Sequence, residues 1–153
     1  MIVYRLGKSQ YSDDLSGEGA RLYGGRWNPV GTSCLYTSQS RALAVLEFSV
    51  NLNILEIPNS LSFTVIEIPD NQIFDVNIRD IPEGWNSFPA STIAKIFGNE
   101  LLKSSDKAII RIPSVIIPTE FNYLLNPYHK SKTQFKIIEV ESFIYDNRIK
   151  TVL

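Results

Sequence analysis

The chain has 153 residues, a formal net charge of −1 and 44% hydrophobic residues, which fits one globular domain with a sizeable core. Its charged residues form no basic or acidic block, so direct nucleic-acid binding is disfavoured. One cysteine excludes an intramolecular disulfide, and one histidine excludes a site that needs two. We expect no metal, because the sequence has no Cys/His cluster. We expect a soluble, cytoplasmic protein, because neither a signal peptide nor a membrane-spanning apolar run is visible.

Taken in chain order, the hydrophobic patterns predict mainly strands. The strands are expected at residues 2–6, 34–37, 61–68, 73–76, 107–112 and 134–145. The helices are expected at residues 40–51 and 89–103, and the loops at residues 12–32, 79–88 and 119–132. Strands without regular β-α-β alternation predict the α+β class, as a single domain of residues 1–153 with a mixed antiparallel sheet and a few helices.

The helix expected at residues 40–51 carries the most informative side chain. Ser40 suits its N-cap, since the hydroxyl can accept from an amide of the first turn. Glu47 falls within the i, i+3, i+4, i+7 pattern that runs from Leu43 to Val50, so we expect it on or beside the buried face. A carboxylate there is costly unless it is paired. The alternatives are a carboxylate at the floor of a cleft and a structural ion pair with Arg21, Arg26 or Arg41.

The glycine-rich loop before this helix is the second candidate for a functional segment. Glycines let a ligand approach the main chain closely, and the aromatic residues of the loop argue against disorder. Arg26 follows two glycines and offers a guanidinium suited to phosphate or carboxylate. The alternative for Arg26 is a partner for Glu47 or a surface arginine stacked on Trp27.

Three further residues are candidates for a binding site, each with a structural alternative. Tyr36, in a short strand, could pack in the core or flank a planar ligand. Ser114 interrupts an apolar strand, where its hydroxyl could serve a site or cap a bend. Asn126, before a proline, is typical of a turn but could contact a ligand. The motifs of serine hydrolases, P-loop enzymes and Rossmann dehydrogenases are absent from the sequence.

In two blocks the sequence resembles the RES domain, a family named for an arginine, a glutamate and a serine. Residues 19–47 read GARLYGGRWNPVGTSCLYTSQSRALAVLE and contain Arg26, Tyr36 and Glu47 at the matching positions. Residues 111–127 read RIPSVIIPTEFNYLLNP and contain Ser114. The resemblance implies an ADP-ribosyltransferase-like fold and NAD⁺ as substrate. It also implies an antitoxin partner with an Xre-like helix-turn-helix domain, and homodimers occur among such proteins.

From this resemblance we expect a toxin of a bacterial type II toxin–antitoxin system. It would cleave NAD⁺ at the nicotinamide–ribose bond, as a glycohydrolase or a phosphorylase. The alternatives are a mono-ADP-ribosyltransferase that acts on a cellular protein and a non-catalytic nucleotide- or partner-binding module. The expected catalytic residues are Glu47, Arg26, Tyr36 and Ser114. The residues expected to contact NAD⁺ are Arg26, Trp27, Asn28, Tyr36, Tyr23 and Asn126.

Overall fold

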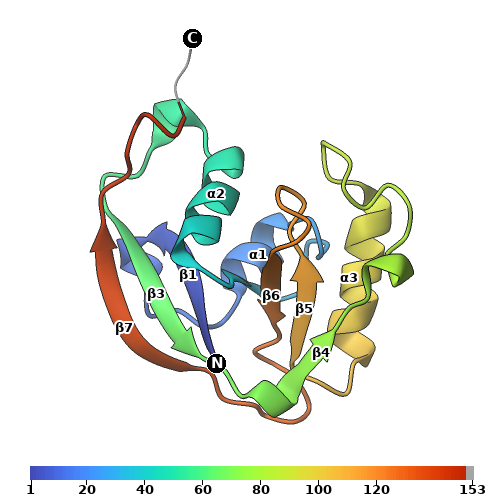
Figure 1. The fold of residues 1–153 in the computed structure, drawn as a ribbon. Helices are drawn as coiled ribbons and strands as arrows, with labels where there is room; N and C mark the ends of the chain where they lie inside the picture. The colour runs from blue at the N-terminus through green and yellow to red at the C-terminus, as the bar shows by residue number, and fades with distance from the viewer. Residues whose placement is uncertain (151–153) are drawn as a thin grey trace.

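The computed structural model describes residues 1–150, which form a seven-stranded sheet with helices around it (Figure 1). The strands are β1 (Ile2–Lys8), β2 (Leu35–Ser38), β3 (Leu61–Glu67), β4 (Ile73–Asp75), β5 (Ile109–Pro113), β6 (Phe121–Leu125) and β7 (Lys136–Phe143). The α-helices are α1 (Glu18–Tyr23), α2 (Arg41–Asn51) and α3 (Thr92–Ser104). Short 3-10 turns lie at Ser9–Tyr11, Ile54–Glu56, Asp70–Gln72 and Ile78–Asp80. None of the helices in residues 1–150 has the length and apolar character needed to cross a membrane.

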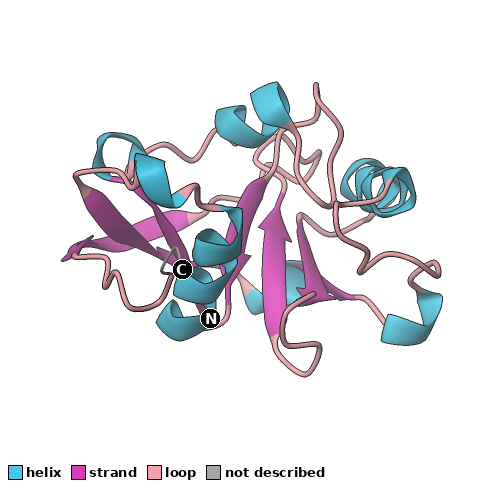
Figure 2. Ribbon diagram, turned by 90° about the horizontal axis from the view of Figure 1, so that it is seen from above, coloured by secondary structure: helices cyan, strands magenta, loops and turns pink. Residues whose placement is uncertain are grey.

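The sheet consists of two halves that meet between β1 and β2. Its strand order is β4-β5-β6-β2-β1-β3-β7, with β4 and β5 parallel and the other neighbours antiparallel. β1 pairs with β3 over its whole length, whereas β1 pairs with β2 only at Tyr4 and Ser38. Figure 1 shows β3 and β7 on one side of α2 and β4, β5 and β6 on the other. In Figure 2 α3 is viewed along its axis, at the β4–β5 end of the sheet. α2 packs against both β1 and β2, so it lies at the junction of the two halves.

The predicted start of α2 is confirmed, but its buried face differs from the prediction. Ser40 is the N-cap, and its hydroxyl accepts a 3.1 Å hydrogen bond from the amide of Leu43. The buried residues of the helix are Leu43, Ala44 and Ser49, whereas Val50 is 50% exposed. The face toward the sheet is therefore rotated from the expected stripe, and Glu47 is half-buried at its border.

The C-terminal end of α2 is fastened by residues near the end of the described chain. The Lys150 ammonium donates to the carbonyl oxygens of Ser49 and Leu52, where a cation also interacts favourably with the helix dipole. The hydroxyl of Tyr145 donates to Ser49 Oγ at 2.8 Å. These contacts hold the C-terminal end of the helix that carries Glu47.

Three secondary-structure predictions were wrong. Residues 119–132 were expected to be a loop, but β6 lies there, between β5 and β2. Its last three residues are all buried, so the segment lacks the alternation that marks a half-exposed strand. α1 falls in another expected loop, because six residues are too few to show helical periodicity. α3 begins at Thr92 rather than near Pro89, since the Ser91 hydroxyl accepts from the amide of Ala94 and caps the helix.

A glycine in α3 allows this helix to pack directly on the loop that carries Arg26. A Cβ atom at Gly98 would lie 2.1 Å from the carbonyl oxygen of Trp27. The Trp27 ring is buried and stacks on Trp85, with the two ring centroids 5.7 Å apart. This contact fixes the loop on the same side of the sheet as α3.

The single cysteine provides a test of the packing in this region. Cys34 is 2% exposed, and burial raises the pKa of its thiol. Because the thiolate is the reactive form, a raised pKa and lost access both slow modification. We expect a thiol reagent at about pH 8 to leave the native protein unlabelled and to label the urea-unfolded protein fully. Rapid labelling of the native protein would contradict the burial of Cys34.

Candidate active site

The carboxylate of Glu47 on α2 binds two side chains from the β5–β6 part of the sheet. Ser114 Oγ donates to Glu47 Oε1 at 2.7 Å, and Asn122 Nδ2 donates to the same oxygen at 2.6 Å. Ser114 directly follows β5, and Asn122 is the second residue of β6. One oxygen of the carboxylate therefore joins α2 to two neighbouring strands.

No arginine in residues 1–150 forms a salt bridge with Glu47. Arg21 pairs with Glu18 at 2.6 Å, and Arg41 pairs with Glu141. Arg26 donates its Nη1 instead to two loop carbonyl oxygens, that of Trp85 at 3.0 Å and that of Ser87 at 2.9 Å. The structural ion pair considered from the sequence is thus not formed, and neutral donors hold Glu47.

Arg26 is nevertheless close enough to Glu47 for the two charges to interact. Partial burial lowers the pKa of Arg26, while the charge of Glu47 raises it. An arginine stays protonated despite such a shift. The Nη1 contacts with the loop also leave other N–H groups of the planar guanidinium available for a ligand.

The second oxygen of Glu47 is available for a ligand. Within residues 1–150, no hydrogen bond reaches Oε2, and no fully buried side-chain polar atom lacks a partner. Oε2 must therefore be in contact with solvent. A carboxylate with one oxygen fixed by donors and the other open is suited to stabilising positive charge on a bound molecule.

Ser114 lies behind Glu47 rather than at the surface. It is fully buried, and its Oγ accepts from the amides of Ile116 at 3.1 Å and Ile117 at 3.2 Å. A hydroxyl has one hydrogen to donate, and here it points to Glu47. Ser114 thus combines the two alternatives from the sequence, since it caps a bend and also binds the candidate carboxylate.

Tyr36 and Asn28 hold the loop that carries Arg26. The Tyr36 hydroxyl accepts from the amide of Trp27 at 3.0 Å and donates to Asn28 Oδ1 at 2.7 Å. Burial raises the pKa of Tyr36 well above its ordinary value, so the hydroxyl stays protonated as a donor. Asn28 is 0% exposed, and its Nδ2 donates to the carbonyl oxygens of Ala20, Pro29 and Thr32. The hydroxyl of Tyr36 is therefore committed to this loop.

Close packing in this loop also explains one of its glycines. A Cβ atom at Gly25 would lie 2.6 Å from the Tyr36 hydroxyl. Any side chain at this position would displace the hydroxyl from Asn28 and Trp27.

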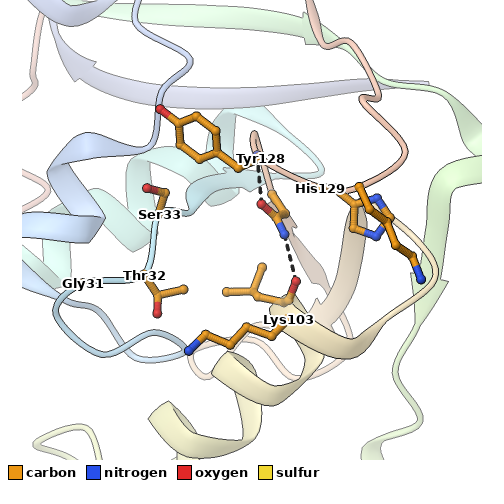
Figure 3. A pocket seen from close by; sticks show the side chains of 9 residues that line it. Gly31, Thr32, Ser33, Lys103, Tyr128 and His129 are labelled. Atoms are coloured by element: carbon orange, nitrogen blue, oxygen red, sulfur yellow. Dashed lines mark hydrogen bonds between the residues drawn. The ribbon is translucent and has the colours of Figure 1, made fainter.

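None of the other residues expected to contact a ligand is a hydrogen-bond partner of the Glu47 carboxylate within residues 1–150. Trp27 and Asn28 are buried within the fold, and Tyr23 is 83% exposed on α1. Asn126 donates to the Leu102 carbonyl oxygen at 2.8 Å and accepts from the amide of Tyr128 at 3.0 Å. It lines a separate cavity of about 460 Å³ at the end of α3 (Figure 3). Glu47, Arg26 and Ser114 do not line that cavity, nor a second one of about 430 Å³ beside β4. We place the candidate site at Glu47, where a charged oxygen is open to a ligand.

Asn122 and Ser38 complete the hydrogen-bonded group around Glu47, and neither was predicted from the sequence as a site residue. Ser38 Oγ on β2 donates to Asn122 Oδ1 at 2.7 Å. Asn122 was not selected because residues 119–132 were predicted to be a loop, and the direction of a side chain cannot be inferred for a loop residue. Within residues 1–150, no group of three or more His, Cys, Asp or Glu side chains is arranged to hold a metal ion.

Comparison with solved structures identifies the fold. A chain of the M. tuberculosis MbcT–MbcA toxin–antitoxin complex matches this structure with a TM-score of 0.75 and 16% sequence identity. The match covers 93% of this chain and 83% of that chain. It confirms the predicted α+β fold.

Comparison with protein families confirms the resemblance seen in the sequence. The family model described as the RES domain matches residues 2–146. The chain belongs to the RES domain family.

Its relatives are named as toxins. It is 39% identical to the "Prs ADP-ribosylating toxin" of Sphingobium sp. (strain YBL2), over 90% of this chain and 88% of that protein. It is 36% identical to a "Toxin Res" of Yersinia enterocolitica, over 98% of this chain and 100% of that protein. It is 40% identical to a "Toxin Res" of Photorhabdus laumondii, over 85% of this chain and 84% of that protein.

Proposed function

We propose that this chain is the toxin of a bacterial toxin–antitoxin system and cleaves NAD⁺ at the nicotinamide–ribose bond. The observation that carries the proposal is the Glu47 carboxylate, which is fixed through Oε1 and open at Oε2. Membership in the RES family and the toxin names of the relatives support the same reading.

In this reaction the carbon–nitrogen bond breaks and its electron pair leaves with nicotinamide, which departs as a neutral molecule. Positive charge then develops on the ribosyl ring, as in glycoside hydrolysis, where a carboxylate stabilises an oxocarbenium-like transition state. Glu47 Oε2 has this role in our proposal, and it also accepts a hydrogen bond from a ribose hydroxyl. The acceptor nucleophile finally bonds to the ribosyl carbon with its own electron pair, and a protonated acceptor such as water releases its proton to the solvent.

Arg26 and Tyr36 have different parts in the proposal. The N–H groups of Arg26 that the loop leaves free bind the pyrophosphate, for which a planar guanidinium is well suited. Tyr36 acts through the loop, since its hydroxyl holds Asn28 and the Trp27 amide next to Arg26. Its half-buried ring remains a candidate to flank the nicotinamide.

The acceptor separates two versions of the proposed enzyme. Water or phosphate as acceptor gives a glycohydrolase or phosphorylase that depletes NAD⁺. A protein side chain as acceptor gives an ADP-ribosyltransferase, and the name of the Sphingobium relative favours that version. Both versions share the cleavage step at Glu47.

The direct test is to incubate the purified protein with NAD⁺ and measure released nicotinamide by chromatography. The reaction is run in plain buffer, with added phosphate, and with a cell lysate and labelled NAD⁺. We expect release in at least one arm, and label on a lysate protein if a protein is the acceptor. A folded protein that releases no nicotinamide in any arm would contradict the proposed cleavage and leave the binding module as the better description.

The proposed partner is an antitoxin, and the neighbour in a toxin–antitoxin complex supports it. From the family resemblance we propose an Xre-like helix-turn-helix antitoxin with a segment that covers Glu47 and engages Arg26. We also propose, from the same resemblance, that two copies of this chain form a homodimer within the complex with the antitoxin.

A further inference from the structure

We propose that Ser38 and Asn122 are positioning residues that fix the orientation of the Glu47 carboxylate. The inference rests on the proposed function, because it assigns the two residues a part in the same reaction. Three hydrogen bonds carry it, from Ser38 to Asn122, from Asn122 to Glu47 and from Ser114 to Glu47.

The direction of each of these hydrogen bonds is determined by chemistry. An ionised carboxylate only accepts, so Asn122 must turn its Nδ2 toward Glu47 and its Oδ1 toward Ser38. Ser38 must then donate its single hydroxyl hydrogen to Oδ1. Ser114 Oγ already accepts from two amides, so its hydrogen is also directed to Glu47. The network therefore has one consistent arrangement.

Ser38 is placed to act through Asn122 and not on a ligand. It is 4% exposed and lies at the single register pair that joins β1 to β2. Its hydroxyl donates to Asn122, and a hydrogen bond in such a buried site is stronger than the same bond in water. The residue thus links the junction of the two half-sheets to the candidate carboxylate.

Loss of the Ser38 hydroxyl would remove the donor to Asn122 Oδ1 and leave the amide held by Glu47 alone. The carboxylate still favours Nδ2, but a loosely held amide would let Oε2 take a wider range of positions relative to the ribosyl ring. Misplacement of a reacting group by about 1 Å can lower a rate by about 10²-fold. We therefore expect kcat to fall about 10-fold in Ser38→Ala and about 10²-fold in Asn122→Ala. KM for NAD⁺ should change far less, because the pyrophosphate contacts of Arg26 are untouched.

Thr37 provides a matched control one residue away. It is also buried on β2, and its hydroxyl donates to the Tyr123 carbonyl oxygen on β6 at 2.8 Å. Thr37→Val removes a side-chain hydrogen bond between the same two strands without touching Glu47. We expect Ser38→Ala and Thr37→Val to lower the melting temperature similarly, and only Ser38→Ala to lower kcat. Ser38→Thr, which keeps the hydroxyl, should recover most of kcat.

A readout independent of catalysis separates this inference from the proposed function. Side-chain NMR of Asn122 should show a rigid amide in the wild type and in Thr37→Val, and a mobile one in Ser38→Ala. A mobile Asn122 amide in the wild type would overturn the inference even if the protein cleaves NAD⁺. Equal kcat values for Ser38→Ala, Asn122→Ala and Thr37→Val would overturn it as well. Absence of NAD⁺ cleavage by a wild type with a rigid amide would instead contradict the proposed function, and the positioning role with it.

Discussion

Replacing Glu47 by glutamine is expected to slow NAD⁺ cleavage by about 10²–10³-fold, the usual effect of removing a preorganised electrostatic group. The glutamine carbonyl can still accept from Ser114 and Asn122, so the hydrogen bonds that hold α2 to β5 and β6 are kept. What is lost is the negative charge at the position of Oε2, where the ribosyl centre becomes positive. Turnover is measured by nicotinamide release, and folding by thermal unfolding.

Glu67→Gln is the matched control for this experiment. Glu67 is an exposed glutamate at the end of β3 and belongs to none of the hydrogen bonds around Glu47. Its variant should keep the turnover and melting temperature of the wild type. Wild-type turnover in a folded Glu47→Gln protein would remove Glu47 from the mechanism.

Gly98→Ala is expected to lower the free energy of unfolding by about 2 kcal/mol or more, within the range for overpacked sites. Alanine favours a helix over glycine by about 1 kcal/mol, which acts in the opposite direction. The steric effect should dominate, because the new Cβ would lie 2.1 Å from a backbone oxygen of Trp27 and no rotamer change can relieve that contact. The measurement is urea unfolding followed by tryptophan fluorescence.

Gly19→Ala makes the same chemical change in a helix with free space. Gly19 is exposed on α1, and a Cβ there meets nothing within 4 Å. Its variant should be as stable as the wild type or more stable by up to about 1 kcal/mol. Destabilisation of similar size in both variants would mean that Gly98 is not constrained by Trp27.

Local patterns were enough to predict much of this fold. The bounds of β1 and of the apolar β3 were predicted to within two residues, and the Ser40 cap gave the start of α2. These features depend on neighbours in sequence, through short apolar runs and the first-turn amides of a helix. The α+β class followed from them and is confirmed.

The parts that could not be predicted depend on distant neighbours. β6 shows no alternation because the fold covers it on both faces, and so Asn122 was assigned to a loop. The sequence singled out Tyr36 but gave no sign that its hydroxyl is bound to Asn28 and Trp27. Glu47 could be selected as a costly half-buried carboxylate, but its actual partners are 67 and 75 residues away.

The strand order also has a consequence for the order of folding. The bond from Ser38 to Asn122 spans 84 residues, and β3 pairs with a strand that begins at Lys136. Closing such long loops costs chain entropy before the new contacts compensate for it, and topologies of this kind fold slowly. The hairpin of β5 and β6 is the local exception. A full-length chain that refolds can therefore form this hairpin early, whereas the arrangement around Glu47 must wait until β2 and α2 have docked against it.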